Sequence, residues 1–174
     1  MSKGQKSFVK GAAILGIAGL IVKIIGAVFR IPLNNIIGSG GMAYYHVAYP
    51  IYTALLVIST AGLPTAISRM VSERVTIGDY RGAHRVFQTA FKWLFIIGVA
   101  TTVLMLAFSG LYARLSAYPD AVPGLLLLAP SLFFVSILSA YRGYFQGLQM
   151  MSPTAITQLV EQVIKLGAGL LLAW

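Results

Sequence analysis

The sequence predicts an all-α protein, a polytopic membrane helical bundle of about five transmembrane helices. Of its 174 residues, 58% are hydrophobic and only 10% are charged. A soluble domain usually carries about 25% charged residues, so this composition would leave too much apolar surface in water. The apolar residues also form long runs, each of which reaches the roughly 20 residues that cross about 30 Å of hydrocarbon. A lipid bilayer is therefore the expected solvent for most of the chain.

Turns rich in glycine, proline and charge separate the predicted spans. An Asn-Asn pair and a glycine-rich segment follow the first span. Ser152 and Pro153 suit the N-cap and the first position of the last helix. Pro50 and Pro64 interrupt the second span, so we expect at least one kink there. The spans are expected at residues 8–31, 43–72, 86–109, 121–147 and 153–174.

Basic residues gather in the loops on one side of the predicted bundle. The formal net charge is +9, from 13 Lys+Arg against 4 Asp+Glu. Loops rich in Lys and Arg stay in the cytoplasm, so we expect a multi-pass cell-membrane protein with a cytoplasmic N-terminus. Orientation explains the charge without a nucleic-acid partner, and we expect none. The cations on this side are Lys3, Lys6, Lys10, Arg69, Arg74, Arg81, Arg85 and Arg142, whereas the other side has Arg114.

The sequence contains no set of residues typical of covalent catalysis. It has no cysteine, which excludes disulfides, thiolate metal sites and a cysteine nucleophile. It has no Ser/His/Asp order, phosphate-binding Walker loop or H-E-x-x-H motif. His46 and His84 have no second ligand at metal-binding spacing. We therefore expect neither an enzyme nor a cofactor or metal site.

Lys23 is the charged residue whose position is hardest to reconcile with a membrane span. It lies about 18 Å beyond Gly11 at 1.5 Å per residue, too deep for easy snorkelling to the cytoplasmic surface. Burying an ammonium group there costs at least about 2.5 kcal/mol, so a partner or a wet cavity must compensate. Arg30 lies on the same face, nearer the outer end, where it can serve the same role or snorkel.

Small residues share this helix face with the two cations. At 100° per residue they lie within about 60° of Lys23, and they allow either a cavity or close helix packing. Close packing explains the glycines but not the lysine, which favours a role in binding. The small residues on this face are Ala12, Gly16, Gly19, Gly26 and Ala27.

The fifth span carries a second polar face. Thr154, Thr157 and Gln158 share it with Glu161 and Lys165. The last two are four residues apart, in the order that favours an ion pair along a helix. They can neutralise each other within the bundle or border the same cavity as Lys23. Cations facing a cavity suit an anionic ligand such as a pyrophosphate, which Arg can hold through two hydrogen bonds.

Three segments of the chain resemble one known family. They are Lys23-Ile-Ile-Gly26 with Arg30-Ile-Pro-Leu33, Ala61-Gly-Leu-Pro-Thr-Ala-Ile-Ser-Arg69, and Arg142-Gly-Tyr-Phe-Gln-Gly-Leu-Gln149 with the residues up to Gln162. Their sequence and spacing resemble the stage V sporulation protein B-like and lipid II flippase branch of the polysaccharide exporter superfamily. The resemblance covers essentially the whole chain, and the third segment is the most specific.

The resemblance implies a flippase that moves undecaprenyl-pyrophosphate-linked saccharides, such as a peptidoglycan precursor, by alternating access between two lobes. It implies that Lys23 and Arg30 contact the pyrophosphate, and it places Glu161 and Lys165 in a charged pattern of the fifth helix. Such proteins are much longer, so we expect a partial N-terminal lobe that lacks its C-terminal lobe and is inactive alone. The expected partners are the lipid-linked oligosaccharide and the surrounding membrane lipids.

Two other functions compete with the flippase. A drug/cation antiporter of the same superfamily would favour acidic residues in the cavity, whereas Lys23 and Arg30 are basic. A membrane scaffold protein that does not transport would tolerate replacement of Lys23. The basic stripe therefore favours an anionic substrate.

Overall fold

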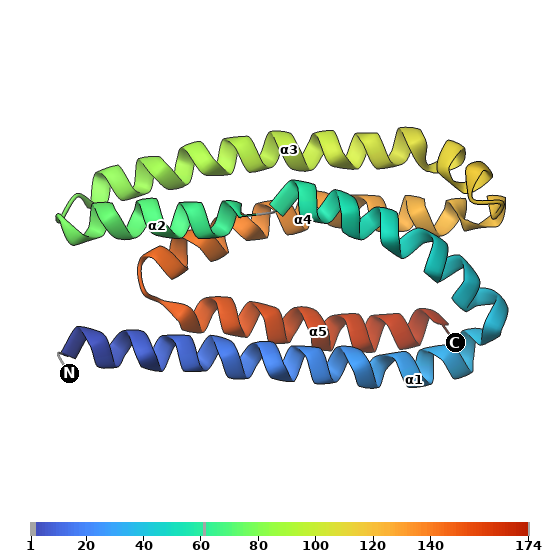
Figure 1. The fold of residues 1–174 in the computed structure, drawn as a ribbon, viewed down its shortest axis with the longest axis horizontal. Coiled ribbons are helices and arrows are strands. Elements are labelled where there is room, and N and C mark those ends of the chain that lie inside the picture. The colour runs from blue at the N-terminus through green and yellow to red at the C-terminus, as the bar shows by residue number, and fades with distance from the viewer. Residues whose placement is uncertain (1–2, 61, 174) are drawn as a thin grey trace. The chain divides into compact units, whose positions relative to one another are not determined.

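The computed structural model of the protein describes residues 3–60 and 62–173 (Figure 1). Every regular element within these ranges is helical, which confirms the predicted all-α class. Ala61, in one of the family-like segments, and Trp174, the expected end of the fifth span, lie outside the described residues. The elements are α1 (Lys3–Thr60), α2 (Leu63–Thr76), α3 (Tyr80–Leu115), the 3-10 turn η1 (Pro119–Ala121), α4 (Val122–Gly147) and α5 (Met151–Ala173).

The chain divides into two compact units, which we describe separately. The terminal unit consists of Met1–Gly40 and Gln149–Trp174, and thus contains the first part of α1 together with α5. The central unit is the continuous segment Gly41–Leu148, and contains the second part of α1 with α2, α3, η1 and α4.

Two glycines break the helices near positions where the sequence predicts a turn or a kink. Gly38 interrupts α1 with φ 69° and ψ −176°, values in the region that favours glycine. The helix before it continues past Ile31 and through Pro32, beyond the expected end of the first span. Gly62 has φ 71° and precedes α2, in which Pro64 occupies the first turn. The expected kink near Pro64 is therefore confirmed, as a complete break between α1 and α2.

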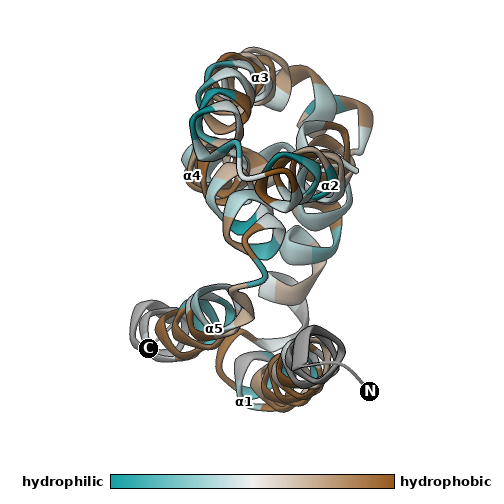
Figure 2. Ribbon diagram, turned by 90° about the vertical axis from the view of Figure 1, so that its left-hand side faces the viewer, coloured by the Kyte–Doolittle hydropathy of each residue, from teal (hydrophilic) through white to brown (hydrophobic). Residues whose placement is uncertain are grey.

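Four segments of the described chain are long and apolar enough to cross a membrane, which supports a multi-pass membrane protein. They are Gly11–Gly38, Gly40–Thr76, Tyr80–Leu115 and Pro119–Gly147. The α2–α3 turn is polar, and Figure 2 shows hydrophilic residues at that end of both helices. Asp79 caps α3 there, because its Oδ1 accepts a 2.8 Å hydrogen bond from the Gly82 amide.

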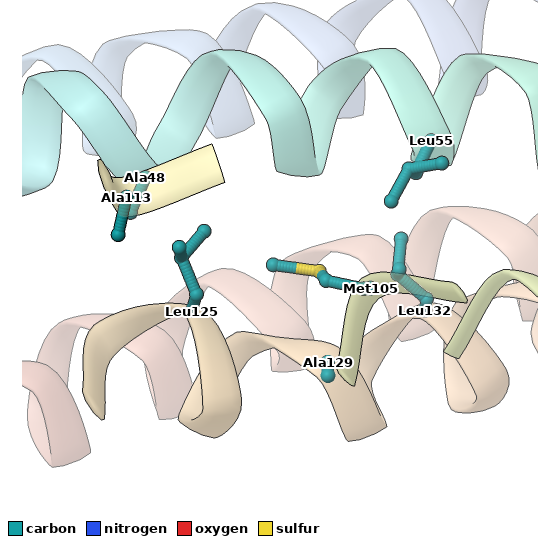
Figure 3. Packing of buried hydrophobic residues seen from close by; sticks show 7 residues of the cluster. All are labelled: Ala48, Leu55, Met105, Ala113, Leu125, Ala129 and Leu132. Atoms are coloured by element: carbon teal, nitrogen blue, oxygen red, sulfur yellow. The ribbon is translucent and has the colours of Figure 1, made fainter. Parts of the chain in front are cut away.

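The central unit has an apolar core between α1, α3 and α4 (Figure 3). Leu55 of α1 and Met105 of α3 lie against Leu125 and Leu132 of α4, and all four are buried. In lipid the hydrophobic effect does not drive helices together, so close packing must supply the attraction. The remaining members of the cluster are the small residues Ala48, Ala113 and Ala129, which let the helix backbones approach.

Two glycines of α4 allow a close contact with α2 in the central unit. A Cβ atom at Gly143 would lie 2.8 Å from the Pro64 carbonyl oxygen, and one at Gly147 would lie 2.6 Å from Val71 Cβ. They are spaced as in the small-xxx-small motif that lets membrane helices pack closely. Gly143 and Gly147 belong to the third family-like segment, and Pro64 belongs to the second. Two segments that carry the resemblance thus pack against each other.

A buried hydrogen bond joins α1 to α4 beside the break at Gly62. The hydroxyls of Ser59 and Ser136 bond to each other, and both residues are fully buried. Ser136 also donates a 2.7 Å hydrogen bond to the Leu132 carbonyl. A buried hydroxyl without a hydrogen-bond partner is costly in an apolar interior. The hydrogen bond between the two serines therefore fixes the register of α1 against α4.

We predict that the two ends of α3 lie on opposite sides of the membrane. The 174 residues contain no cysteine, so this part of the protein adds no labelling of its own to a single introduced cysteine. In intact cells, a membrane-impermeant maleimide is expected to label Ser116→Cys and to spare Ile77→Cys until the cells are opened. If Ile77→Cys alone were labelled in intact cells, the protein would have the opposite orientation to the one predicted.

We predict that Gly147→Ala destabilises the protein. Its new methyl group would overlap Val71 and the Ser68 carbonyl, and overpacking of this kind costs about 1–3 kcal/mol. The measurement is the thermal unfolding midpoint in detergent. Gly124→Ala is the matched control on the same helix, because a Cβ there meets nothing within 4 Å. An equal midpoint for the two variants would exclude the α2–α4 contact as described.

Candidate functional site

All four residues predicted to contact substrate lie in the terminal unit. Lys23 and Arg30 are on α1, and Glu161 and Lys165 are on α5. The side chains of all four are exposed. The structure thus brings the two predicted polar helices into one unit, although their role in substrate binding stays a prediction.

The first part of α1 and α5 run in the same direction, side by side (Figure 1, Figure 2). Their contact near the start of α5 fixes the register. A Cβ atom placed at the buried Gly11 would lie 2.7 Å from Met151 Cγ and 3.5 Å from Met151 Cβ. Gly11 and Met151 are therefore at the same level along the two helices.

The parallel register places Lys23 level with the charged residues of α5. Lys23 lies about 18 Å beyond Gly11, and the same rise beyond Met151 reaches Val163. Val163 lies between Glu161 and Lys165 in the sequence, so three of the four predicted residues occupy one level of the unit. Arg30 lies about 10 Å further along α1.

The glycines of the α1 stripe do not pack closely against any described residue. A Cβ atom at Gly16, Gly19 or Gly26 would meet nothing within 4 Å. Close helix packing, the competing explanation for these glycines, is therefore absent within the part of the chain that the structure describes. The face that carries Lys23 is open there, as a substrate-contacting surface requires.

The polar face of α5 changes from buried to exposed along the helix. Thr154 is buried, Thr157 and Gln158 are half-buried, and Glu161 and Lys165 are exposed. Thr157 donates a 2.9 Å hydrogen bond to the Thr154 carbonyl, which satisfies its hydroxyl locally. The ion pair expected between Glu161 and Lys165 stays a prediction. The charged end of this face coincides with the level of Lys23.

One surface feature escaped the sequence reasoning. A groove of about 550 Å³ lies between α2 and α3 in the central unit, with Arg74 and Arg85 among its lining residues. The sequence predicts that both arginines belong to a cytoplasmic loop that sets orientation, and it leaves binding of anionic lipid headgroups by residues 79–85 as the less favoured alternative. A signal was nonetheless present, because Arg85, Thr89 and Trp93 recur at helical spacing on one face of α3.

Charged residues on exposed faces of apolar, membrane-length helices define the class of protein. Such residues are rare in membrane spans and usually mark the route of a substrate or an ion. This arrangement is characteristic of membrane transport proteins.

Sequence comparison identifies the family. Residues 8–174 match the family model described as polysaccharide biosynthesis protein, and the chain belongs to this family. It is 30% identical to the lipid II flippase MurJ of Bacillus subtilis strain 168 over 93% of this chain and 31% of that protein. It is 31% identical to stage V sporulation protein B of the same strain, over 93% of this chain and 32% of that protein. The resemblance seen in the motifs is thereby confirmed.

A third similar protein is the uncharacterised membrane protein YabM of the same strain, 32% identical over 90% of this chain and 29% of that protein. The chain thus spans about a third of the length of these curated relatives. No solved structure matches the chain. The family and the similarity to a flippase assign the chain to transport proteins and not to enzymes, as expected.

We predict that a disulfide forms between cysteines introduced at positions 11 and 151. The Cβ separation of 3.5 Å at this pair lies within the range for disulfides. The variant with Gly11→Cys and Met151→Cys is oxidised in membranes, and its chain is then cleaved at a point between α1 and α5. The two fragments should stay linked. The control pairs Met151→Cys with Gly16→Cys, whose Cβ meets no described atom within 4 Å. If only the fragments of the control variant stayed linked, the register that places Lys23 level with Glu161 and Lys165 would be wrong.

Proposed function

We propose that the protein containing this chain is a flippase that moves undecaprenyl-pyrophosphate-linked saccharides, such as a lipid II-like peptidoglycan precursor, across the cell membrane. Lys23 and Arg30 would contact the pyrophosphate, and Glu161 and Lys165 would border the same path. The relatives with assigned names are a lipid II flippase and a sporulation protein, which supports this substrate class and a role in cell-wall synthesis.

The observation that carries the proposal is the common level of Lys23, Glu161 and Lys165 on two parallel helices of one unit. An ammonium group in an apolar span needs a compensating anion. A pyrophosphate supplies that charge, and charge-assisted hydrogen bonds to it are about twice as strong as neutral ones. The open small-residue stripe beside Lys23 would leave room for the lipid-linked group.

Alternating access would follow the general pattern of transporters, in which one bundle rocks against another around a central site. The chain covers about a third of its relatives, so the complete cycle is proposed for the polypeptide as its natural host produces it. The chain is proposed to contribute helices of one lobe, with its N-terminus in the cytoplasm.

We predict that Lys23→Ala abolishes flippase function and that Lys23→Arg retains it. Loss of a charged hydrogen bond to the pyrophosphate should lower transport at least about tenfold, whereas Arg preserves the charge. The measurement is growth of cells depleted of their own lipid II flippase, rescued by the natural polypeptide with each substitution. Immunoblots of the membrane fraction confirm equal amounts of each variant.

Lys92→Ala is the matched control, because Lys92 is an exposed lysine on α3 in the central unit. It should support normal growth. Full rescue by Lys23→Ala would overturn the proposed binding role and would favour a scaffold protein. Loss of rescue by all three lysine variants would indicate a defect in folding or membrane insertion instead, because Lys23→Arg keeps the positive charge.

A further inference from the structure

The groove between α2 and α3 has a polar end and an apolar end. Its polar end lies at the α2–α3 turn, where Arg74, Asp79 and Arg85 line it. Away from the turn, its lining is mostly apolar and includes Leu63, Trp93 and Ile97. Since α2 and α3 are antiparallel, these two ends lie far apart along the groove.

The length of the groove matches one leaflet of a bilayer. Along α3 the distance from Arg85 to Ile97 is about 18 Å at 1.5 Å per residue. One leaflet of the hydrocarbon core is about 15 Å thick, half of the usual 30 Å. The volume of about 550 Å³ lies within the range of small-molecule sites.

The charged end of the groove is organised and carries a net positive charge. Asp79 Oδ2 accepts a 3.3 Å hydrogen bond from Arg74 Nη1, while Oδ1 of the same carboxylate accepts from the Gly82 amide. One aspartate thus caps α3 and positions Arg74, whose guanidinium keeps further donors. No carboxylate of the described residues forms an ion pair with Arg85. The polar end of the groove therefore suits a single phosphate group.

We propose that this groove binds an anionic phospholipid of the cytoplasmic leaflet, with its phosphate at Arg74 and Arg85 and an acyl chain along the apolar wall toward Trp93. Basic residues at the membrane surface attract anionic headgroups. Two arginines at one end of a groove also select for the geometry of a phosphate group. The site is separate from the face that carries Lys23, and its ligand differs from the transported substrate.

Trp93 provides a direct reporter of this lipid. It lines the groove and is 63% exposed, and the sequence has only one other tryptophan, Trp174. In the natural polypeptide, with Trp174 and any tryptophan outside this sequence replaced by Phe, the fluorescence of Trp93 is measured in phosphatidylcholine vesicles that contain a minor fraction of phosphatidylglycerol. Brominated chains, which quench tryptophan on contact, are carried either by the phosphatidylglycerol or by an equal fraction of the phosphatidylcholine.

We expect brominated phosphatidylglycerol to quench Trp93 more strongly than the same fraction of brominated phosphatidylcholine. Arg85→Gln should reduce the preference about fivefold, the effect of one basic residue at a membrane surface. Arg81→Gln is the matched control, because it removes the same charge from α3 at an exposed position outside the groove. Ala66→Phe should lower the quenching without changing the charge, because Ala66 lines the groove.

Three results would overturn the proposal. Equal quenching by the two brominated lipids would mean that the groove does not select anionic lipid. Absence of quenching by either lipid would mean that another helix or a second copy covers Trp93. An equal loss of preference in Arg81→Gln and Arg85→Gln would mean that the basic surface attracts anionic lipid without a defined site. Flippase assays on Lys23 variants are independent of all three results.

Discussion

The approach of α2 to α4 is the contact on which the central unit depends. In lipid, two helices attract each other only as far as their surfaces fit, and side chains at the crossing would hold the backbones apart. Gly143 and Gly147 remove these side chains, so that the Pro64 and Ser68 carbonyls of α2 come within van der Waals reach of α4. The break at Gly62 is equally necessary, because it redirects the chain from α1 so that α2 can follow this path. The Ser59–Ser136 hydrogen bond then fixes the register beside the break.

The sequence was sufficient to predict the helical class and the regions that contain its two breaks. Long apolar runs predict membrane helices because the bilayer thickness is fixed. Gly38 lies in the predicted glycine-rich turn, whereas the second break was expected from Pro64 and its positive φ falls at Gly62. The end of the first helix was harder to predict, since Pro32 is tolerated where α1 simply continues. Proline removes one hydrogen bond, and whether the helix continues depends on compensation that the local sequence does not specify.

The candidate site was predictable only in part. The depth of Lys23 identifies it as anomalous in an apolar span, because depth can be counted along the sequence and the cost of burying a charge rises toward the centre of the membrane. Which helix lies beside it depends on tertiary contacts, and a single sequence did not indicate that α1 and α5 are neighbours that meet at Gly11 and Met151. The α2–α3 groove was missed for the opposite reason. Arg74 and Arg85 have an adequate explanation as orientation signals, and only the antiparallel packing of α2 on α3 places both at one groove.

The two groups of basic residues differ in the free-energy cost of placing their charge in the bilayer. Arg74 and Arg85 lie at the end of a polar turn, where water and headgroups solvate a guanidinium at little cost and a bound lipid can stay. Lys23 lies well inside an apolar span, where insertion costs about 2.5–3.5 kcal/mol for a charged residue. A permanently bound partner would remove that cost but would also block a route for substrate. A charge that is compensated only while an anionic substrate passes suits transport, and the open stripe beside Lys23 is consistent with such transient occupation. In the two sites that we propose, the same pairing of a cation with a phosphate serves retention at the interface and passage within the membrane, and the depth of the cation distinguishes them.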